Sequence, residues 1–471
     1  MASSRKRARP AATTTDPKRA AKRPKTTLGL KYAPSEKLDV YVFGSGENGE
    51  LGLGSVQYNG KKPKDVKRPR LNHLLDAETV GAVHIAAGGM HCVALTEDQN
   101  ILTWGVNDDG ALGRDTTRNS STQSADAVSD DEDDDEDLNP RETAPGIVLP
   151  EFFGRTRKRF AHVAATDSAS FALTMKGMVY GCGTFRGNDG IIGFSEELAL
   201  KKNSKERCQR TPIRIAGLAN IKLIAAGGNH MLALDHKGNV FSWGCGEQGQ
   251  LGRSTSGRNR AKDLTPSQVD LPKRRIRHVS CGSFHSFAID DAGQVYSWGL
   301  NNFGQTGITK GASEKDASIE TPVIVPSLAR FDITEIQGGN HHSVACTKTG
   351  ELLVWGRCDD SQLGILLEEL SQKDLIFDDR QNPRILMNPA TIPGIHATSV
   401  AAGIDNCIVV DKLGKVYSWG FSASYRTGLG TLDPVETPTM LENSALVGKR
   451  LTSAFCGGQF SVLAGPGSLR P

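Results

Sequence analysis

Two glycine-rich segments of this sequence match the pattern of a dinucleotide-binding loop. GSGENG begins at Gly44 and GCGEQG begins at Gly244, and both fit GxGxxG. A dinucleotide-binding loop leads into a helix whose N-terminus meets the pyrophosphate. Each segment here leads into another glycine turn, so we interpret both as structural turns. The sequence also lacks a P-loop, and we expect the chain itself to bind no nucleotide and no cofactor.

Histidines that recur at one position of a repeated segment are the next candidates for chemistry. They are His91, His230, His285 and His342, and the other copies have Ala169, Asn406 and Phe460. Ligands spread over separate repeats do not converge on one ion, so no metal site is expected. Each imidazole is predicted to bond to local backbone groups instead. Because the positions are equivalent, we expect these residues on one face of the molecule, near a channel mouth.

The cysteines and the hydropathy pattern indicate a reduced, soluble protein. Nine cysteines are scattered along the chain without any CxxC pair, which favours buried thiols over disulfides or a zinc site. The N-terminus lacks the apolar core of a signal peptide, and no stretch approaches the roughly 20 apolar residues that cross a bilayer. We therefore expect an intracellular protein without a membrane partner.

Charge is distributed unevenly along the chain. The whole sequence has a net charge of +3, yet residues 1–25 contain nine Lys or Arg against the single acid Asp16. The basic residues are Arg5, Lys6, Arg7, Arg9, Lys18, Arg19, Lys22, Arg23 and Lys25. Their setting of Pro, Ala and Thr predicts a disordered tail over residues 1–37. Two basic clusters suit importin binding for nuclear import and contacts to phosphate groups, which predicts a nuclear protein.

One pattern recurs seven times and defines the elements that must position any site. A short strand ends in Trp-Gly or a variant, and a glycine-rich turn follows that closes on Leu-Gly or a variant. The anchoring glycines are Gly44, Gly105, Gly183, Gly244, Gly299, Gly356 and Gly420, with spacings of 61, 78, 61, 55, 57 and 64. This period suits one four-stranded propeller blade with long loops. With 52 glycines and only 6% aromatic residues, the composition also favours an all-β protein.

A second motif pairs with each Trp-Gly strand after the first, as in IAAGGNHMLAL before the strand at Trp243. In five copies the intervening turn ends in glycine, which predicts a β-hairpin with a left-handed residue. These glycines are Gly177, Gly238, Gly293, Gly350 and Gly414. All five tryptophans occupy one repeat position, so we expect them to pack the blades.

The two ends of the repeat region complement each other. The chain opens on a Trp-Gly-type strand at Asp39–Gly44 and closes on FCGGQFSVLAG, which has no Trp-Gly strand after it. Together these halves complete one blade and remove the exposed sheet edges of an open array. We predict a closed seven-bladed β-propeller over residues 38–465, in which the N- and C-terminal elements share one blade. A C-terminal tail is expected over residues 466–471.

The double motif, its long period and the count of seven resemble the regulator of chromosome condensation family. The resemblance covers roughly residues 38–465 and is carried further by ALGRDT at Ala111, GEQGQLGR at Gly246 and GTFRGNDG at Gly183. It implies guanine-nucleotide exchange on the Ran GTPase at chromatin, which supplies nuclear Ran-GTP for nucleocytoplasmic transport and mitosis. It also implies binding to the nucleosome, to both histones and DNA, through the basic tail and a face of the propeller. A propeller scaffold without exchange activity is the alternative. A sensor like the plant ultraviolet photoreceptor of this family needs clustered tryptophans, whereas here they are spread over the repeats.

One repeat departs from the others and is the main candidate for partner contact. Its turn, GTFRGNDGIIG from Gly183, is two residues longer than GVNDDGALG at Gly105. By resemblance to the family this turn is a β-wedge that enters the GTPase. Its residues are Gly183, Thr184, Phe185, Arg186, Gly187, Asn188, Asp189 and Gly190. We expect Phe185 and Arg186 to be exposed.

Other contact residues are transferred from the family one by one. Asp167 matches a family aspartate, His341 with His342 matches a His-His pair, and Glu47 stands where the family has an acid. Asn229 replaces a family aspartate, so we expect its substitution to matter least and that of Asp167 to matter less than loss of the wedge. No carboxylate pair or nucleophile constellation stands outside the repeat pattern, so an enzyme is not expected.

A strongly acidic segment interrupts the repeats. Nine acids lie between Asp126 and Leu138, within an insert at about residues 119–140 that stretches one repeat spacing to 78. A run of this charge is predicted to be disordered. We interpret it as a passive solvated loop, with shielding of basic surfaces as the alternative.

Overall fold

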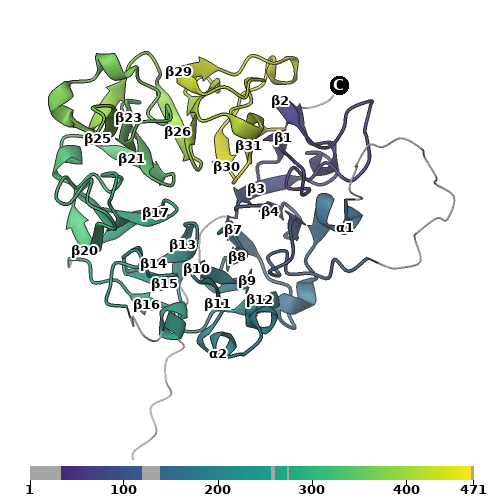
Figure 1. Ribbon diagram of the computed structural model, residues 1–471. Helices are drawn as coiled ribbons and strands as arrows, with labels where there is room; N and C mark the ends of the chain where they lie inside the picture. The colour runs from purple at the N-terminus through teal and green to yellow at the C-terminus, as the bar shows by residue number, and fades with distance from the viewer. Residues whose placement is uncertain (1–32, 119–137, 256–259, 273–274, 468–471) are drawn as a thin grey trace, which may run out of the picture.

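The computed structural model describes residues 33–118, 138–255, 260–272 and 275–467. These residues form seven antiparallel sheets arranged as blades around a central channel (Figure 1). The predicted all-β propeller is confirmed. Most of the basic tail, the acidic segment and the end of the C-terminal tail fall outside the described residues, at 1–32, 119–137 and 468–471.

The strands of each blade are given in order of hydrogen bonding. The first four blades contain β2 (Val66–Leu71), β1 (Leu38–Gly44), β31 (Phe460–Pro466) and β30 (Ser453–Cys456); β3 (Ala82–Ala87), β4 (His91–Thr96), β5 (Ile101–Gly105) and β6 (Gly146–Ile147); β7 (Phe160–Ala165), β8 (Ala169–Thr174), β9 (Val179–Gly183) and β12 (Gln209–Arg214); and β13 (Ile221–Ala226), β14 (His230–Asp235), β15 (Val240–Gly244) and β16 (Ser267–Gln268). The other three contain β17 (Ile276–Cys281), β18 (His285–Asp290), β19 (Val295–Leu300) and β20 (Ser318–Ile324); β21 (Ile333–Gly338), β22 (His342–Thr347), β23 (Leu352–Arg357), β25 (Pro383–Ile392) and β24 (Leu375–Phe377); and β26 (Ala397–Ala402), β27 (Asn406–Asp411), β28 (Val416–Gly420) and β29 (Val435–Met440).

Short helices and a separate hairpin lie between the blade strands. The hairpin consists of β10 (Phe185–Gly187) and β11 (Gly190–Gly193), and the α-helices are α1 (Pro140–Thr143) and α2 (Glu196–Ala199). Single turns of 3-10 helix occupy His73–Leu75, Pro150–Phe153, Ser204–Arg207, Arg260–Leu264, Pro326–Leu328, Leu367–Glu369, Gln372–Asp374, Ala423–Tyr425 and Ser444–Leu446. No helix in the described part of the chain is both long and apolar enough to cross a membrane.

The two ends of the propeller close the ring in one blade, as predicted. Strand β1 pairs with β31 in antiparallel register, from Leu38 opposite Pro466 to Gly44 opposite Phe460. All seven residues of β1 are buried, because β1 lies between β2 and β31 inside the sheet. Closure therefore buries a strand that an open array would leave with an exposed edge.

The predicted hairpins form, with glycine in the left-handed region at each of the five turns. For example, Gly177 has φ 72° and Gly238 has φ 92°. The sixth such turn, between β4 and β5, has Gln99 in this conformation with φ 64°, where no glycine marked it in the sequence. Both GxGxxG segments are also turns, and Gly46 and Gly49 have φ 70° and 79°.

The tryptophans pack neighbouring blades together, as predicted. All five are at most 1% exposed. Four of them donate an indole N–H bond to the backbone carbonyl of a turn residue in the preceding blade, and Trp298 does so to Gln250 over 2.9 Å. Trp243 packs edge-on against Phe171 instead, with ring centroids 6.0 Å apart. Four of the five tryptophans thus combine a large apolar contact with a directional bond between blades.

The repeated histidines join blades through side chains, so the prediction of local backbone partners is wrong. His230 Nε2 lies 2.8 Å from Ser286 Oγ, and His285 Nε2 lies 2.8 Å from Ser343 Oγ. The Ser286 hydroxyl donates its proton to the Gln250 carbonyl over 3.0 Å, so the imidazole must supply the proton of the other bond. Burial lowers the pKa of His230 to about 3, which keeps the ring neutral.

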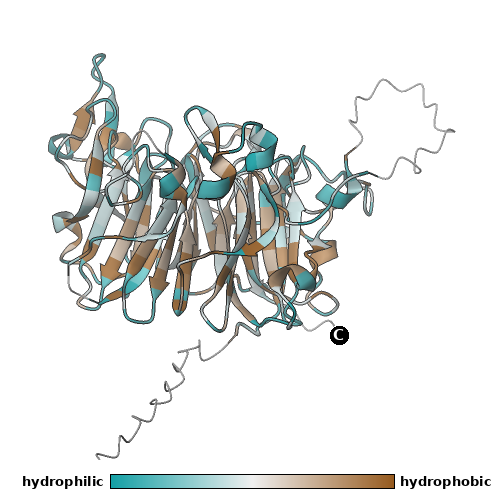
Figure 2. Cartoon of the chain, turned by 90° about the horizontal axis from the view of Figure 1, so that it is seen from below, coloured by the Kyte–Doolittle hydropathy of each residue, from teal (hydrophilic) through white to brown (hydrophobic). Residues whose placement is uncertain are grey.

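The apolar residues gather in the stacked strands, while polar residues mark the loops at both faces (Figure 2). The central channel has a volume of about 1380 Å³.

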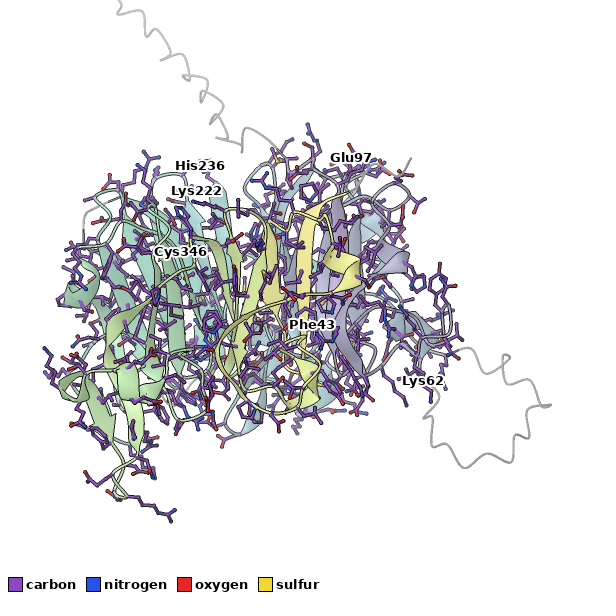
Figure 3. The ribbon with its side chains drawn as sticks, turned by 90° about the horizontal axis from the view of Figure 1, so that it is seen from above. Phe43, Lys62, Glu97, Lys222, His236 and Cys346 are labelled. Atoms are coloured by element: carbon purple, nitrogen blue, oxygen red, sulfur yellow. The ribbon has the colours of Figure 1, made fainter. Side chains whose placement is uncertain are left out.

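All nine cysteines are free, and eight are buried, as predicted. Figure 3 places Glu97 and His236 on one face of the ring and Lys62 on the other.

Candidate functional site

The irregular turn of the third blade forms the hairpin β10–β11 beside the channel (Figure 1). Arg186 pairs with Ile191, and Gly187 pairs with Gly190. Gly190 has φ +100°, a backbone region that favours glycine. Gly187 permits a close approach, because a Cβ atom there would lie 2.5 Å from Glu247 Oε1. The two extra residues therefore build a hairpin that the regular turns do not have.

An ion pair fixes the first strand of the hairpin to the blade before it. Arg186 Nη2 lies 2.7 Å from Asp109 Oδ2, and Arg186 Nε donates to the same oxygen over 2.8 Å. The Asp109 side chain is only 14% exposed, whereas that of Arg186 is 46% exposed. A two-nitrogen contact to a partly buried carboxylate is directional. The contact with Asp109 holds the Arg186 guanidinium at this face of the propeller.

The tip of the hairpin is fixed to the blade after it. Glu247 Oε2 accepts a bond from the Asn188 N–H over 2.8 Å, and the other Glu247 oxygen pairs with Arg260. Arg260 also lies 2.9 Å from Asp189 Oδ2, whose side chain is 84% exposed. The tip is therefore held by its backbone and by one side chain, while most of its polar surface faces solvent.

Asn229 connects the hairpin to Asp167. Its Oδ1 accepts a bond from the Arg186 N–H over 2.9 Å, and its Nδ2 donates to Asp167 Oδ2 over 3.2 Å. An aspartate here could accept the first bond but could not donate the second. The structure thus gives the neutral side chain a specific role, and we revise the expectation that Asn229 matters least.

Asp167 stands at the mouth of the channel. Its side chain is exposed and its N–H donates to the Gly228 carbonyl over 2.8 Å. Surrounding protein raises the pKa of Asp167 to about 7 by desolvation of the charged form. The Asp167 carboxyl is therefore partly protonated near neutral pH.

Backbone hydrogen bonds between equivalent loops form a belt around this mouth. They run from Asp167 to Gly228, from Gly228 to Ser283, from Ser283 to Gly339, from Asn340 to Ile404 and from Gly458 to Gly89, over 2.8 to 3.2 Å. The belt fixes the loops that carry the candidate contacts. It makes this face a rigid platform for the hairpin.

Several predicted contact residues lie inside the protein. The prediction that Phe185 is exposed is wrong, because its ring is 0% exposed and packs with Phe171 and Phe194, each at a centroid distance of 6.0 Å. Thr184 and His342 are also 0% exposed, and Gly183 is buried. These residues support the surface rather than forming it.

The remaining candidates are distributed around the same face. His341 is partly buried, and its ring is tilted against the Phe303 ring with centroids 4.8 Å apart. Burial lowers the pKa of His341. Glu47 is exposed in the closing blade. Neither residue is brought into contact with the hairpin, so the structure groups Asp167, Asn229 and the hairpin and leaves Glu47 and His341 apart from them.

Sequence reasoning missed the three side chains that brace the hairpin, namely Asp109, Glu247 and Arg260. A signal was present for Glu247, which occupies in GCGEQG the position of Glu47 in GSGENG. Asp109 lies in the regular turn GVNDDGALG, which shows no sign in the sequence of a contact with the hairpin. Arg260 stands in a long connection without a motif. Among the described residues, no group of three or more His, Cys, Asp or Glu could hold a metal ion.

Comparisons with known proteins support the propeller fold. The model of the RCC1-like domain matches residues 39–463. The chain is 38% identical to the guanine nucleotide exchange factor SRM1 of Saccharomyces cerevisiae over 92% of this chain and 88% of that protein. The crystal structure of Prp20p from the same yeast, described with its binding properties to Gsp1p and histones, matches with a TM-score of 0.81 and 35% identity over 93% of each chain.

A second solved structure contains yeast RCC1 (Prp20) bound to Kap60. It matches with a TM-score of 0.82 and 34% identity over 98% of this chain and 97% of that one. The family model covers far more than half of the chain, from strand β1 to strand β31. The chain belongs to the RCC1 family, the regulators of chromosome condensation.

Proposed function

We propose that this protein is a guanine-nucleotide exchange factor for a Ran-type GTPase and that it acts on chromatin in the nucleus. The observation that carries the proposal is the exposed hairpin β10–β11, which side chains of both neighbouring blades hold beside the channel mouth. The likeness to SRM1, named as an exchange factor, and to Prp20p, described with Gsp1p and histones, supports the same conclusion.

Exchange requires no covalent chemistry by this chain. If the propeller binds the empty GTPase more tightly than the loaded one, linkage requires that nucleotide binds the complex more weakly by the same factor. A rigid hairpin that enters the nucleotide site displaces the phosphate-binding groups of the GTPase. The acidic side chains at this face, including Asp167 and Asp189, compete for its phosphate-binding lysine. GTP then rebinds because it is the more abundant nucleotide.

The contacts from the neighbouring blades make the hairpin β10–β11 rigid before it binds a partner. A hairpin that must order itself on binding loses the free energy of ordering its backbone, about 1 to 2 kcal/mol per residue fixed. The contacts of Asp109, Asn229 and Glu247 order the hairpin before the GTPase arrives. Binding free energy is then available to stabilise the nucleotide-free state.

Release of a fluorescent GDP from purified Ran tests the proposal. The triple variant Arg186→Ser, Asn188→Ser, Asp189→Ser removes the exposed tip and keeps the buried Phe185. Loss of an interface hot spot costs about 2 kcal/mol or more, so we expect release to slow at least about 30-fold while the Tm is unchanged. The matched control changes Lys176, Lys237 and Lys412, which are exposed in hairpin turns of the opposite face, to Ser.

The competing function is a chromatin-bound scaffold without exchange activity. Parental protein that binds chromatin but does not accelerate GDP release at any concentration would establish it. A tip variant that folds and exchanges at the parental rate would show instead that the hairpin is a surface insertion. Both outcomes contradict the proposed role of β10–β11.

A further inference from the structure

The turn after strand β28 has an arginine where the equivalent turns of three other blades have glutamine. It reads FSASYRTG from Phe421, and Arg426 stands at the position of Gln250, Gln305 and Gln362. In those turns the Oε1 atom of each glutamine accepts a bond from the backbone N–H two residues earlier, over 2.8 to 2.9 Å. An arginine side chain has no acceptor, so this turn lacks that bond.

The backbone of the same turn is also unusual. Ser424 and Tyr425 have φ of 61° and 57°. Four other blades have glycine at the position of Tyr425, for example Gly249 with φ 72° and Gly304 with φ 65°. A residue with a Cβ atom is disfavoured in this region, and such positions gather at functional sites. The turn thus departs from the repeat at two adjacent positions, which favours a role beyond packing for Arg426.

Arg426 is buried without a carboxylate partner. Among the described residues it is the only Lys or Arg that is buried, with 7% of its surface exposed. Its Nε donates to the Ala423 carbonyl over 2.8 Å, and its guanidinium lies 5.4 Å from the centroid of the Phe421 ring. Asp405, whose charge acts on Arg426, lies 3.8 Å from Arg357 Nη1 instead. Within the described part of the chain, Nη1 and Nη2 of Arg426 have no hydrogen-bond partner.

Other partly buried arginines of the protein are compensated by acids. Arg253 pairs with Asp263 over 3.3 Å, and Arg357 pairs with Asp360 over 2.9 Å. A buried charge without such a partner is unfavourable, because it has lost water and gained little in return. Burial accordingly lowers the pKa of Arg426. The fold therefore presents a desolvated cation that an external anion would stabilise.

Arg426 lies on the face that carries the hairpin β10–β11. Its turn follows β28 as the hairpin follows β9, so both stand at the same end of their blades. Arg426 lines the channel, as do Asp167 and Arg186. The turn is fixed to the closing blade by Ser461 Oγ, which donates to the Arg426 carbonyl over 2.8 Å. A partner that covers the channel mouth beside the hairpin reaches this guanidinium.

We propose that Arg426 forms an anion subsite that binds a carboxylate side chain of the GTPase. A guanidinium can donate two parallel N–H bonds to a carboxylate, and Nη1 and Nη2 are the atoms that bond nothing in the described chain. The acids of this face, including Asp167 and Asp189, attract positive groups of the partner. A single buried cation among them adds the opposite charge and fixes the orientation of the partner. The inference rests on the proposed function and adds a contact on a different blade from the hairpin.

Dissociation of the complex with nucleotide-free Ran, followed by biolayer interferometry with the full chain, tests this inference. Arg426→Gln gives the turn the residue that three other blades have, so we expect a parental Tm. Loss of one partner of a buried charge pair acts mainly on dissociation, which should become at least about 30-fold faster. Arg426→Lys keeps the charge and should dissociate at least about threefold more slowly than Arg426→Gln.

The matched control is Lys412→Gln. It removes one positive charge from an exposed hairpin turn of the same blade on the opposite face. Because an exposed charge there makes no contact with the GTPase, the control should dissociate at the parental rate.

A double-mutant cycle identifies the partner carboxylate. Asp→Asn and Glu→Gln variants of Ran are each measured with the parental chain and with Arg426→Gln. We expect one acid whose loss speeds dissociation at least about tenfold from the parental chain but hardly at all from Arg426→Gln.

Three results would overturn the inference. A folded Arg426→Gln variant with parental dissociation would show that the guanidinium binds nothing on the GTPase. Equal rates for Arg426→Gln and Arg426→Lys would show that the charge plays no part, and the absence of a coupled acid would leave Arg426 a role only within its own turn. In each case parental binding to Ran leaves the proposed function intact. A parental chain that does not bind nucleotide-free Ran would reject the proposed function and this inference together.

Discussion

Substitution of Asn229 is the sharpest test of how the hairpin is held. Asn229→Ala removes the acceptor of the Arg186 N–H and the donor to Asp167. A hydrogen bond contributes a net 0.5 to 1.5 kcal/mol, and partly exposed bonds like these lie at the lower end, so the pair is worth about 1 kcal/mol. Since 1.4 kcal/mol corresponds to tenfold, we expect GDP release from Ran to slow about fivefold.

The conservative variant separates positioning from a merely structural effect. Asn229→Asp keeps the acceptor for the Arg186 N–H but places a second carboxylate 3.2 Å from Asp167. The pKa of Asp167 is raised to about 7, so at pH 6 its proton can bridge the two groups. At pH 8 the two charges repel each other. We expect N229D to exchange near the parental rate at pH 6 and near the N229A rate at pH 8.

The assay is stopped-flow release of labelled GDP at pH 6, 7 and 8, with each variant expressed as a ratio to the parental protein. Gln459→Ala is the matched control, because Gln459 is exposed at the same repeat position in the closing blade. Its rate should equal the parental rate at every pH. Parental exchange by N229A, or a flat pH profile for N229D, would refute the bridge between the hairpin and Asp167.

Four further predictions concern the ring and its tail. Removal of Thr452–Pro471 takes away β30 and β31, and the truncated chain should aggregate or melt far below the parental Tm. His285→Ala loses a buried imidazole and its bond to Ser343, which should lower the free energy of unfolding by about 2 to 4 kcal/mol in urea. The pKa of His230 falls from about 6.5 to about 3 on folding, so stability is lost as the pH drops below 6.5. The loss amounts to about 2 kcal/mol at pH 5, and His230→Asn should show a smaller drop in Tm between pH 7.5 and 5. Deletion of residues 1–25 should weaken salt-sensitive chromatin binding and spare exchange in solution.

The architecture could be predicted because each repeat contains the residues that determine its own turns and strands. A turn glycine, a Trp-Gly strand end and an apolar strand recur in every copy or nearly so, and local chain geometry follows from them. Ring closure also followed, since the unpaired halves at Asp39–Gly44 and in FCGGQFSVLAG had no other partner. Partners between blades were not predictable in this way. The bond from His230 to Ser286 joins residues of different repeats that no local pattern connects.

The hairpin shows the same limit at the candidate site. Its extra length identified it, but length alone did not show that Phe185 turns inward. Gly181 explains that packing, because a Cβ atom there would lie 2.5 Å from the Phe171 ring. The space that a larger side chain would fill is occupied by the rings of Phe171 and Phe194, and Phe185 packs against both of them. Bracing by Asp109 and Glu247 depends on contacts 77 and 59 residues away, which sequence spacing does not report.

The shared blade also determines when the propeller can close during synthesis of the chain. Strand β1 leaves the ribosome early, but β31, its neighbour in the sheet, follows roughly 400 residues later, which at 5 to 20 residues per second is about 20 to 80 s. During that interval the apolar strand LDVYVFG has one unsatisfied edge, and such edges recruit other strands. This edge of β1 therefore stays open to other strands until β31 has been made and the last blade closes.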